Sequence, residues 1–220
     1  MKLQKRIKRL LFPPRCVFCQ TMQAEEGMCK TCASELPRRP QPRMKSVVPC
    51  VDELYVPLYY EGYVRSAILR YKFGGVKCSG REFAKLMEPC IREGLDGRFD
   101  CITWVPTSRA RSNQRGYDQS EVLARELGKL LDAPVVSLLK KCRNNPPQSR
   151  QGTREQRVAN TLGVFDMKPE SVIGKSILLI DDIATTGTTL SECARVLKTA
   201  GAERVYAATI AKKRLFQKKN

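Results

Sequence analysis

Histidine is absent from this chain of 220 residues, so no imidazole can serve in catalysis or bind a metal ion. Aromatic residues make up 7% of the sequence, and few of them lie among the basic residues. Base stacking is therefore a weak expectation for any nucleic-acid site. Catalysis and metal binding have to come from carboxylates, hydroxyls, arginines and thiols.

Long apolar runs are also missing. No segment approaches the roughly 20 apolar residues that a membrane-spanning helix needs, and no secretory signal is visible. The first residues alternate between basic and apolar side chains before Pro13 and Pro14. This pattern predicts either a short amphipathic helix on a membrane or nucleic acid, or a basic helix packed on its own domain. We favour the second interpretation.

Basic residues greatly outnumber acidic ones. The chain has 40 lysines and arginines against 22 aspartates and glutamates, which gives a formal net charge of +18. This excess favours polyanionic partners such as nucleic acid, anionic lipid or phosphorylated substrates, and the alternative is a solvated surface with a basic bias. The 220 residues are enough for one α/β domain and a small module, and 42% of them are hydrophobic.

Ten cysteines without a secretory signal indicate a reducing compartment. Four of them form two C-x-x-C pairs that lie close together, Cys16 with Cys19 and Cys29 with Cys32. Two such turns can direct four thiolates at one Zn²⁺, and four protein ligands leave no open position, so this zinc would be structural. A redox pair is the alternative, but that motif normally occurs singly. Metal would supply the folding energy that so small a module lacks.

The segment 176–190 is the most informative part of the chain. Four apolar residues from Ile177 to Ile180 predict a buried parallel strand, and Asp181 and Asp182 follow at its carboxyl end. A loop of small and hydroxyl residues comes next, and a helical pattern follows the loop. In open α/β sheets, ligands bind at the carboxyl ends of the strands.

The loop after the two acids suits a phosphate group. Its backbone N–H groups can turn toward an anion, the helix dipole favours negative charge, and Gly187 permits a close approach. The carboxylates suit hydroxyl groups or a metal ion beside that phosphate. A diol plus a phosphate describes ribose 5-phosphate. The loop residues concerned are Ala184, Thr185, Thr186, Gly187, Thr188 and Thr189.

This segment resembles the phosphoribosyl-diphosphate (PRPP) signature of type I phosphoribosyltransferases. The resemblance implies that Asp181 and Asp182 hold the ribose hydroxyls and that residues 184–189 hold the 5-phosphate. The alternative is an ordinary strand, turn and helix with a threonine as the helix cap.

A second strand, loop and helix come earlier in the chain. Residues 101–105 predict a buried strand, 107–116 a loop with three arginines and no acid, and 119–131 an amphipathic helix. Because this loop also follows the carboxyl end of a strand, we expect it to face the same crevice as the acid pair. Guanidinium groups there can pair with a diphosphate leaving group. The candidate residues are Thr107, Ser108, Arg109 and Arg115.

Further elements complete an α/β pattern. Strands are predicted over 53–60, 135–138, 161–165 and 204–210, and helices over 63–73 and 83–91. Residues 140–160 form a long polar stretch, which inside a compact domain is usually functional or disordered. If the protein is an enzyme, we expect a loop over 143–157 to close over the site and exclude water. Its candidate residues are Arg150, Arg154 and Arg157.

The order of these features resembles the ComF family of competence-associated, phosphoribosyltransferase-like proteins. The features are the zinc module, the basic linker, Val105-Pro106, the run Arg115-Gly116-Tyr117-Asp118-Gln119, then Gln148, Arg154, Arg157 and Asn160, and finally Asp181-Asp182. Where relatives more usually carry an aromatic–Asn pair, this chain has Tyr117-Asp118. The resemblance implies an α/β fold with a type I phosphoribosyltransferase-like parallel sheet and a small N-terminal zinc-ribbon-like module. We expect a zinc-binding module over 1–36, a basic linker over 37–52 and the phosphoribosyltransferase-like domain over 53–220.

The resemblance also implies a bacterial cytoplasmic protein that is needed for DNA uptake in natural transformation. Such a protein handles internalised single-stranded DNA, with a helicase-like partner, and has a PRPP-type pocket. A true phosphoribosyltransferase acting on a nucleobase or another small nucleophile stays open as an alternative. In that case Mg²⁺ would bridge the diphosphate, and the arginines would stabilise the charge of the leaving group. No residue stands out as a general base.

We expect purified protein to contain one Zn²⁺, bound by Cys16, Cys19, Cys29 and Cys32. Replacing Cys16 by Ser should unfold the N-terminal module and largely spare the α/β domain, because only the module depends on the metal. Metal analysis combined with limited proteolysis measures both effects, with Cys50→Ser as the control outside the two pairs. Wild-type protein without zinc would contradict the prediction.

Overall fold

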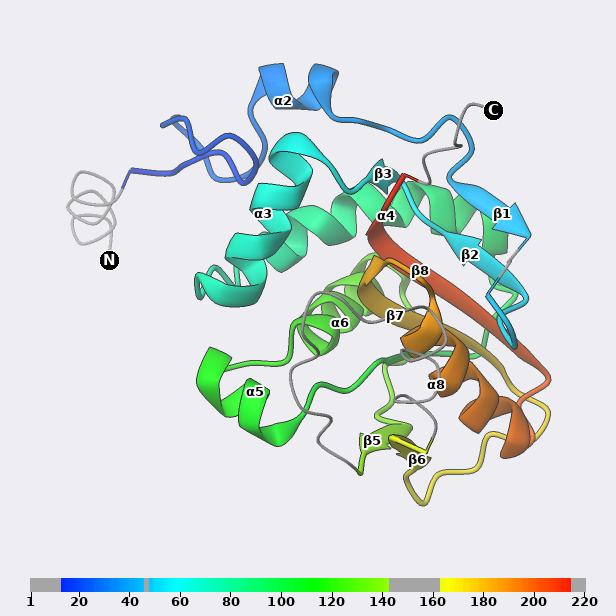
Figure 1. Ribbon diagram of the computed structural model, residues 1–220. Helices are drawn as coiled ribbons and strands as arrows, with labels where there is room; N and C mark the ends of the chain where they lie inside the picture. Colours follow the sequence, from blue (N-terminus) through cyan, green and yellow to red (C-terminus); the bar gives the residue numbers. More distant parts are fainter. Residues whose placement is uncertain (1–12, 46–47, 143–162, 215–220) are drawn as a thin grey trace, which may run out of the picture.

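A mixed sheet runs through the centre of the molecule (Figure 1). The structure is a computed structural model that describes residues 13–45, 48–142 and 163–214. Within these residues the strand order is β1-β2-β8-β7-β4, and β3 also pairs with β8. The strands are β1 (Arg43–Lys45), β2 (Glu53–Tyr55), β3 (Leu58–Tyr59), β4 (Cys101–Trp104), β7 (Ser176–Ala184) and β8 (Arg204–Lys212).

The centre of the sheet is parallel. Strand β7 lies between β4 and β8 and pairs with both in parallel, so that Ile180 lies opposite Trp104 on one side and Ala208 on the other. Its side chains alternate between two hydrophobic clusters: Leu178 and Ile180 belong to one, and Ile177 and Leu179 to the other. Such a strand is buried on both faces, which explains why its sequence is a continuous apolar run.

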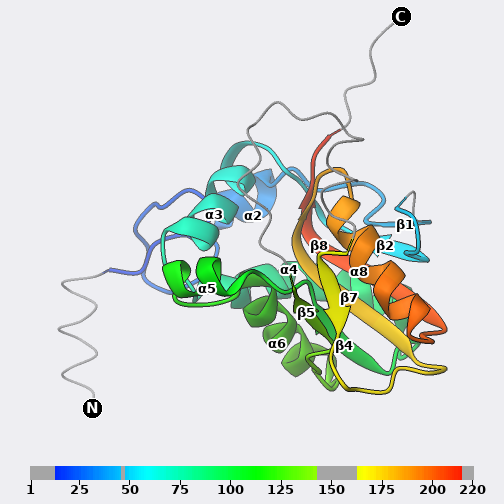
Figure 2. The same ribbon diagram turned by 60° about the horizontal axis from the view of Figure 1, so that its bottom comes forward.

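Helices cover both faces of the sheet (Figure 2). The first cluster joins the sheet to α3, α4 and α6, and the second joins it to α8. The helices are α2 (Lys30–Glu35), α3 (Gly62–Phe73), α4 (Ser79–Leu95), α5 (Arg109–Arg115), α6 (Gln119–Leu131) and α8 (Thr188–Thr199). The sequence predicts an α/β fold with a parallel sheet, and the structure has one, with β1 as an antiparallel edge strand.

Several predicted boundaries agree with the structure. Helix α6 spans the predicted residues 119–131, and the Asp118 side chain caps it by accepting the backbone N–H groups of Ser120 and Glu121. Helix α3 ends at Gly74, as predicted, and Pro57 separates β2 from β3.

The prediction of a loop over 107–116 was wrong, because α5 occupies most of it. The Ser108 hydroxyl caps this helix by accepting the Arg111 backbone N–H at 3.4 Å. The helix ends at Gly116, whose φ of 77° is left-handed. A serine before the helix and a glycine after it are ordinary helix boundaries, which the absence of large apolar residues between them obscured.

The prediction of a strand over 135–138 was also wrong. This segment makes one bridge, from Val135 to Ile102. The Leu138 N–H then donates to the side-chain hydroxyl of Thr103 and not to a backbone carbonyl of that strand. The next residues form β5 (Leu139–Lys141), which pairs with β6 (Phe165–Met167) as a separate antiparallel ribbon. Two further bounds differ: α4 begins at Ser79, and the predicted linker contains the edge strand β1.

Three predicted features lie outside the described residues, wholly or in part: the basic N-terminus, the polar stretch 140–160 and the strand over 161–165. Among the helices that the structure does describe, none combines the length and the apolar character needed to span a bilayer.

Candidate functional site

The acid pair lies inside β7, which continues to Ala184 rather than ending before the acids. Asp181 pairs with Thr209 of β8 in the sheet register. Asp182 is buried, with 8% of its surface exposed, and its side chain points to the same pocket as that of Asp181. Sheet pairing thus fixes the backbone that carries both carboxylates.

A pocket of about 280 Å³ surrounds the two acids. Of the predicted residues, those that line it are Asp181, Asp182, Thr185, Thr189, Thr107 and Arg115. Arg111, one of the three arginines of the predicted loop, also lines it. So do five residues that were not predicted as site residues: Lys72, Gln119, Ser120, Lys141 and Phe165. Three larger hollows in the described surface hold neither acid: two lie beside α4 and α6, and one lies around Asp52 and Glu53.

The carboxylates are held by three short contacts. The Ser120 hydroxyl donates to Asp181 Oδ1 at 3.1 Å, and the Asp182 backbone N–H donates to the same oxygen at 2.8 Å. Lys72 Nζ, from the last turn of α3, lies 2.9 Å from Asp182 Oδ2. The partner of Asp182 is therefore a lysine from a distant part of the sequence.

Burial changes the protonation of this group. Withdrawal from solvent and the neighbouring Asp182 raise the pKa of Asp181 to about 7, against the lowering effect of Lys72. Burial lowers the pKa of Lys72, but the charge and hydrogen bond of Asp182, together with the charge of Asp181, outweigh burial and raise that pKa. Lys72 and Asp182 are thus held as an ion pair, and Asp181 is the carboxyl that exchanges a proton near neutral pH.

The loop after β7 forms a tight turn into α8. Thr185 and Thr186 are exposed, and the hydroxyls of Thr186 and Thr188 lie 2.9 Å apart. Gly187 caps α8 with a φ of 78°, and a Cβ there would lie 2.5 Å from Val48 Cγ2. A side chain at this position would meet both a strained backbone and a clash, so the turn requires glycine.

Helix α5 brings arginines to the opposite side of the pocket. Arg111 and Arg115 line it. The Arg115 guanidinium lies 4.7 Å from the centre of the Phe73 ring, and its Nη1 donates to Gln119 Oε1 at 2.7 Å. Of the other predicted diphosphate residues, Ser108 uses its hydroxyl to cap α5, and the side chain of Arg109 lies outside the description.

Asp118, whose role the sequence left open, makes hydrogen bonds to two segments that border the pocket. Its Oδ2 accepts the Thr107 backbone N–H at 2.7 Å, and its Oδ1 caps α6. Burial raises the pKa of this carboxyl. Asp118 thus fixes the start of α6 to the segment that follows β4.

The ribbon of β5 and β6 closes a third side. Lys141 lines the pocket, with Nζ 5.5 Å from the centre of the Phe165 ring, and burial together with Arg111 lowers its pKa. In the sequence, Lys141 belongs to a basic stretch, and no pattern marks it as a pocket residue. The predicted Arg150, Arg154 and Arg157 lie outside the described residues.

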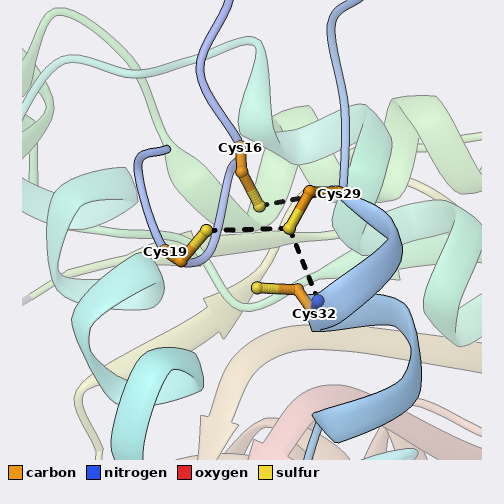
Figure 3. A group of neighbouring side chains, drawn as sticks. All are labelled: Cys16, Cys19, Cys29 and Cys32. Atoms are coloured by element: carbon orange, nitrogen blue, oxygen red, sulfur yellow. Dashed lines mark hydrogen bonds between the residues drawn. The ribbon is translucent and has the colours of Figure 1, made fainter. Parts of the chain in front are cut away.

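The four predicted zinc ligands converge at a second site (Figure 3). Their Sγ atoms all lie within 4.8 Å of one another, and those of Cys19 and Cys29 are 3.7 Å apart. Tetrahedral zinc with bonds of about 2.3 Å needs sulfur atoms about 3.8 Å apart, so the cluster fits this metal. It is the one metal-type cluster within 13–45, 48–142 and 163–214.

Hydrogen bonds to three of the sulfurs favour thiolates, whereas burial and the neighbouring thiols raise the pKa of the fourth, Cys32. The side chain and backbone of Thr21 lower the pKa of Cys19 to about 6. Backbone N–H groups donate to two other sulfurs, from Cys29 to Cys16 Sγ and from Cys32 to Cys29 Sγ, each at 3.4 Å. Oriented N–H donors of this kind stabilise a metal-bound thiolate.

Two protein families match successive parts of the chain. The double zinc ribbon domain matches residues 7–44, and the phosphoribosyl transferase domain matches residues 117–219. The fold prediction is therefore confirmed. The zinc ribbon match and the four clustered cysteines together support a structural zinc.

Curated relatives cover most of the chain. Competence protein ComFC of Bacillus subtilis (strain 168) is 26% identical over 84% of this chain and 72% of its own length. Competence protein F of Haemophilus influenzae (strain ATCC 51907 / DSM 11121 / KW20 / Rd) is 26% identical over 86% of each chain. The resemblance to competence proteins that the sequence motifs indicated is confirmed.

Solved structures match at lower similarity. A purine phosphoribosyltransferase from Pyrococcus horikoshii Ot3 is 18% identical, with a TM-score of 0.39, over 61% of this chain and 74% of its own. The allosteric regulatory enzyme of purine biosynthesis is 19% identical, with a TM-score of 0.40, over 61% of this chain and 26% of its own.

We expect Asp181 to make the protein less stable as pH rises from 5 to 8. Its pKa is higher in the folded chain than in the unfolded one, so the folded state binds more protons in this range and stability falls as they leave. Between pH 5 and 8, the free energy of unfolding of the Asp181→Asn variant should decrease by about 1–2 kcal/mol less than that of wild type. Urea unfolding at several pH values measures it. Exposed Glu170→Gln is the control, and a variant with the pH slope of wild type would contradict the assignment.

Proposed function

We propose that this chain, a homologue of the ComFC and competence F proteins, binds PRPP or a related phosphoribosyl ligand in the pocket around Asp181 and Asp182. In the same proposal it acts in competence by handling internalised single-stranded DNA. One observation carries the ligand assignment: a carboxylate pair, a hydroxyl loop at a helix N-terminus and two arginines line or border one pocket.

Each part of the pocket suits one part of the ligand. Asp181 and Asp182 can accept hydrogen bonds from the ribose hydroxyls. The turn that contains Thr185 and Thr186 offers hydroxyls and the positive end of α8 to the 5-phosphate. Arg111 and Arg115 can pair with diphosphate oxygens from the other side.

A divalent cation fits this arrangement. The pocket combines hard carboxylate oxygens with space beside them, and Mg²⁺ prefers to be held by a few carboxylates and the phosphates of its ligand. When bound, Mg²⁺ would neutralise diphosphate charge. Lys72 already compensates Asp182, so a ligand that engages this carboxylate has to share it with the lysine.

A true phosphoribosyltransferase acting on a nucleobase or another small nucleophile is the second candidate. The raised pKa of Asp181 favours it, because a carboxyl that exchanges a proton near neutral pH can take one from an acceptor. Arg111 and Arg115 would stabilise the departing diphosphate, which is electrostatic catalysis. Release of diphosphate from PRPP with a panel of nucleobases separates this enzyme from a protein that only binds the ligand.

The DNA-handling role rests on the net charge of +18 and on the homology. Three exposed basic residues lie among or just after the zinc ligands: Lys30 lies between Cys29 and Cys32, and Arg38 and Lys45 follow Cys32 along the chain. We assign residues 1–36 to the zinc module, 37–52 to a basic linker and 53–220 to the phosphoribosyltransferase-like domain, and we expect the protein to work in the cytoplasm beside a helicase-like partner. Phosphate contacts from the module and linker would bind DNA with little sequence preference.

Calorimetry with Mg²⁺ and PRPP tests the pocket. Asp182→Asn should abolish measurable binding or weaken it at least tenfold, because the variant loses a charged acceptor in a buried pocket. Thr186→Val should cost about 1–3 kcal/mol if the removed hydroxyl leaves a phosphate oxygen unpaired. Thr199→Val, at the far end of α8, is the matched control. Wild-type affinity in both pocket variants would reject this ligand site.

Charge reversal tests the DNA contact. Replacing Lys30, Arg38 and Lys45 by Glu should strongly weaken single-stranded DNA binding at moderate salt and reduce its salt dependence, while PRPP affinity stays the same. A control variant with Arg65, Lys175 and Lys213 replaced by Glu changes the net charge equally at other exposed positions. Equal loss in both variants would show a non-specific charge effect and remove the module and linker from the role.

A further inference from the structure

The last turn of α3 contacts the zinc ribbon and the pocket at the same time. Arg70, Tyr71, Lys72 and Phe73 are four consecutive residues, and successive residues of a helix point about 100° apart. Each of them therefore meets a different neighbour. Figure 1 shows α3 between the zinc ribbon and the α5 side of the molecule.

Arg70 faces the zinc ribbon. Its Nη2 donates to the carbonyl oxygens of Val17 at 2.8 Å and of Phe18 at 2.7 Å. These two residues lie between Cys16 and Cys19, inside the first C-x-x-C turn. The half-buried guanidinium thus depends on two carbonyls whose positions the cysteine turn sets.

Tyr71 extends the contact through an aromatic row. Phe18 of the cysteine turn packs edge-on against Phe83 at 5.8 Å between ring centres, and Phe83 packs against Tyr71 at 5.4 Å. The Tyr71 hydroxyl donates to the Gln119 carbonyl at 2.7 Å, and Tyr117 donates its hydroxyl to the Tyr71 carbonyl. The row therefore ends at the first residue of α6, beside the pocket.

Lys72 and Phe73 reach the pocket directly. Lys72 pairs with Asp182 at 2.9 Å, and Phe73 supports the Arg115 guanidinium at 4.7 Å. Phe73 is otherwise 69% exposed, so this contact accounts for the position of a large apolar side chain at the surface. The last turn of α3 thus places Lys72 beside the acid pair and Phe73 beside Arg115.

We propose that the last turn of α3 couples the zinc ribbon to the pocket, with Arg70 as the positioning residue that links them. The identity of the pocket's ligand rests on the proposed function, but the link between the ribbon and α3 does not. Without metal, the Cys16–Cys19 turn loses the ion that holds its two thiolates, and Arg70 loses two fixed acceptors. The turn that carries Lys72 and Phe73 then loosens.

Coupling between two sites has to act in both directions. If zinc holds the pocket in its binding geometry, the ligand that prefers this geometry holds the ribbon in turn. Mg²⁺-PRPP should therefore raise the affinity of the ribbon for zinc, so that a higher concentration of a zinc-selective chelator is needed at equilibrium to remove the metal. A ligand that binds to a domain independent of the ribbon would leave the zinc affinity unchanged. The reciprocal effect therefore distinguishes coupling from a general loss of fold.

Hydrogen–deuterium exchange on the full chain tests the link without any ligand. Removing zinc, or replacing Arg70 by Met, should speed exchange in residues 70–73 and at the start of α6, and leave α8 on the other face unchanged. Arg65→Met is the matched control, since Arg65 is exposed on the same helix. Arg70→Lys keeps the charge with fewer donors and covers the case in which Arg70→Met does not fold. Unchanged exchange in the last turn of α3 after zinc removal would overturn the proposal.

Calorimetry then measures the coupling. Zinc removal and Arg70→Met should each weaken Mg²⁺-PRPP binding by about 5- to 50-fold, a typical range for coupled sites, and zinc removal from the Arg70→Met protein should add little more. Affinity within twofold of wild type in both cases would reject the coupling while leaving the ligand site intact. If wild-type protein does not bind PRPP, the proposed function fails, and the exchange experiment alone decides the link.

Discussion

The pairing of β7 with β4 and β8 is the constraint on which the site depends. A strand that is hydrogen-bonded along both edges and covered on both faces has almost no freedom, so the residues it carries are placed by the sheet. Asp181 and Asp182 lie on this strand, and their positions follow from its register. A neighbouring parallel strand leads into the segment that holds Thr107, and Asp118 ties that segment to α6. The pocket is therefore a product of the sheet's order rather than of any one loop, as in other open α/β sheets.

The zinc ribbon is stabilised in a different way. Its described buried residues are few, namely Cys16, Phe18, Cys32 and Leu36, and they belong to the first hydrophobic cluster together with residues of α3 and α4. The metal replaces the core that the module is too small to form. Arg70 and the aromatic row then attach this metal-dependent unit to the sheet-dependent one. Two units with unrelated sources of stability share one short stretch of helix.

The sequence predicted the parts whose causes are local. The apolar run of β7, the amphipathic pattern of α6 and the spacing of the four cysteines are each visible within a few residues. The errors have local causes as well. Helix α5 has no large apolar residues, so it looked like a polar loop, and the Leu138 N–H donates to the Thr103 hydroxyl in place of the expected strand pairing. Lys72 could not be predicted as a pocket residue, because no sequence pattern around position 72 indicates a contact with Asp182. Only the folded chain brings α3 to the end of β7.

The four contacts of the last turn of α3 also set how this chain can change in length. Inserting or deleting one residue before Arg70 would turn the following residues by about 100° and move each side chain to its neighbour's direction. Lys72 would leave Asp182 at the same moment that Arg70 left the cysteine turn. A substitution removes one contact, whereas a change of register removes all four together. Variation in the length of related chains is therefore expected at the Gly74–Gly75 turn, which follows this helix, and not within its final turn.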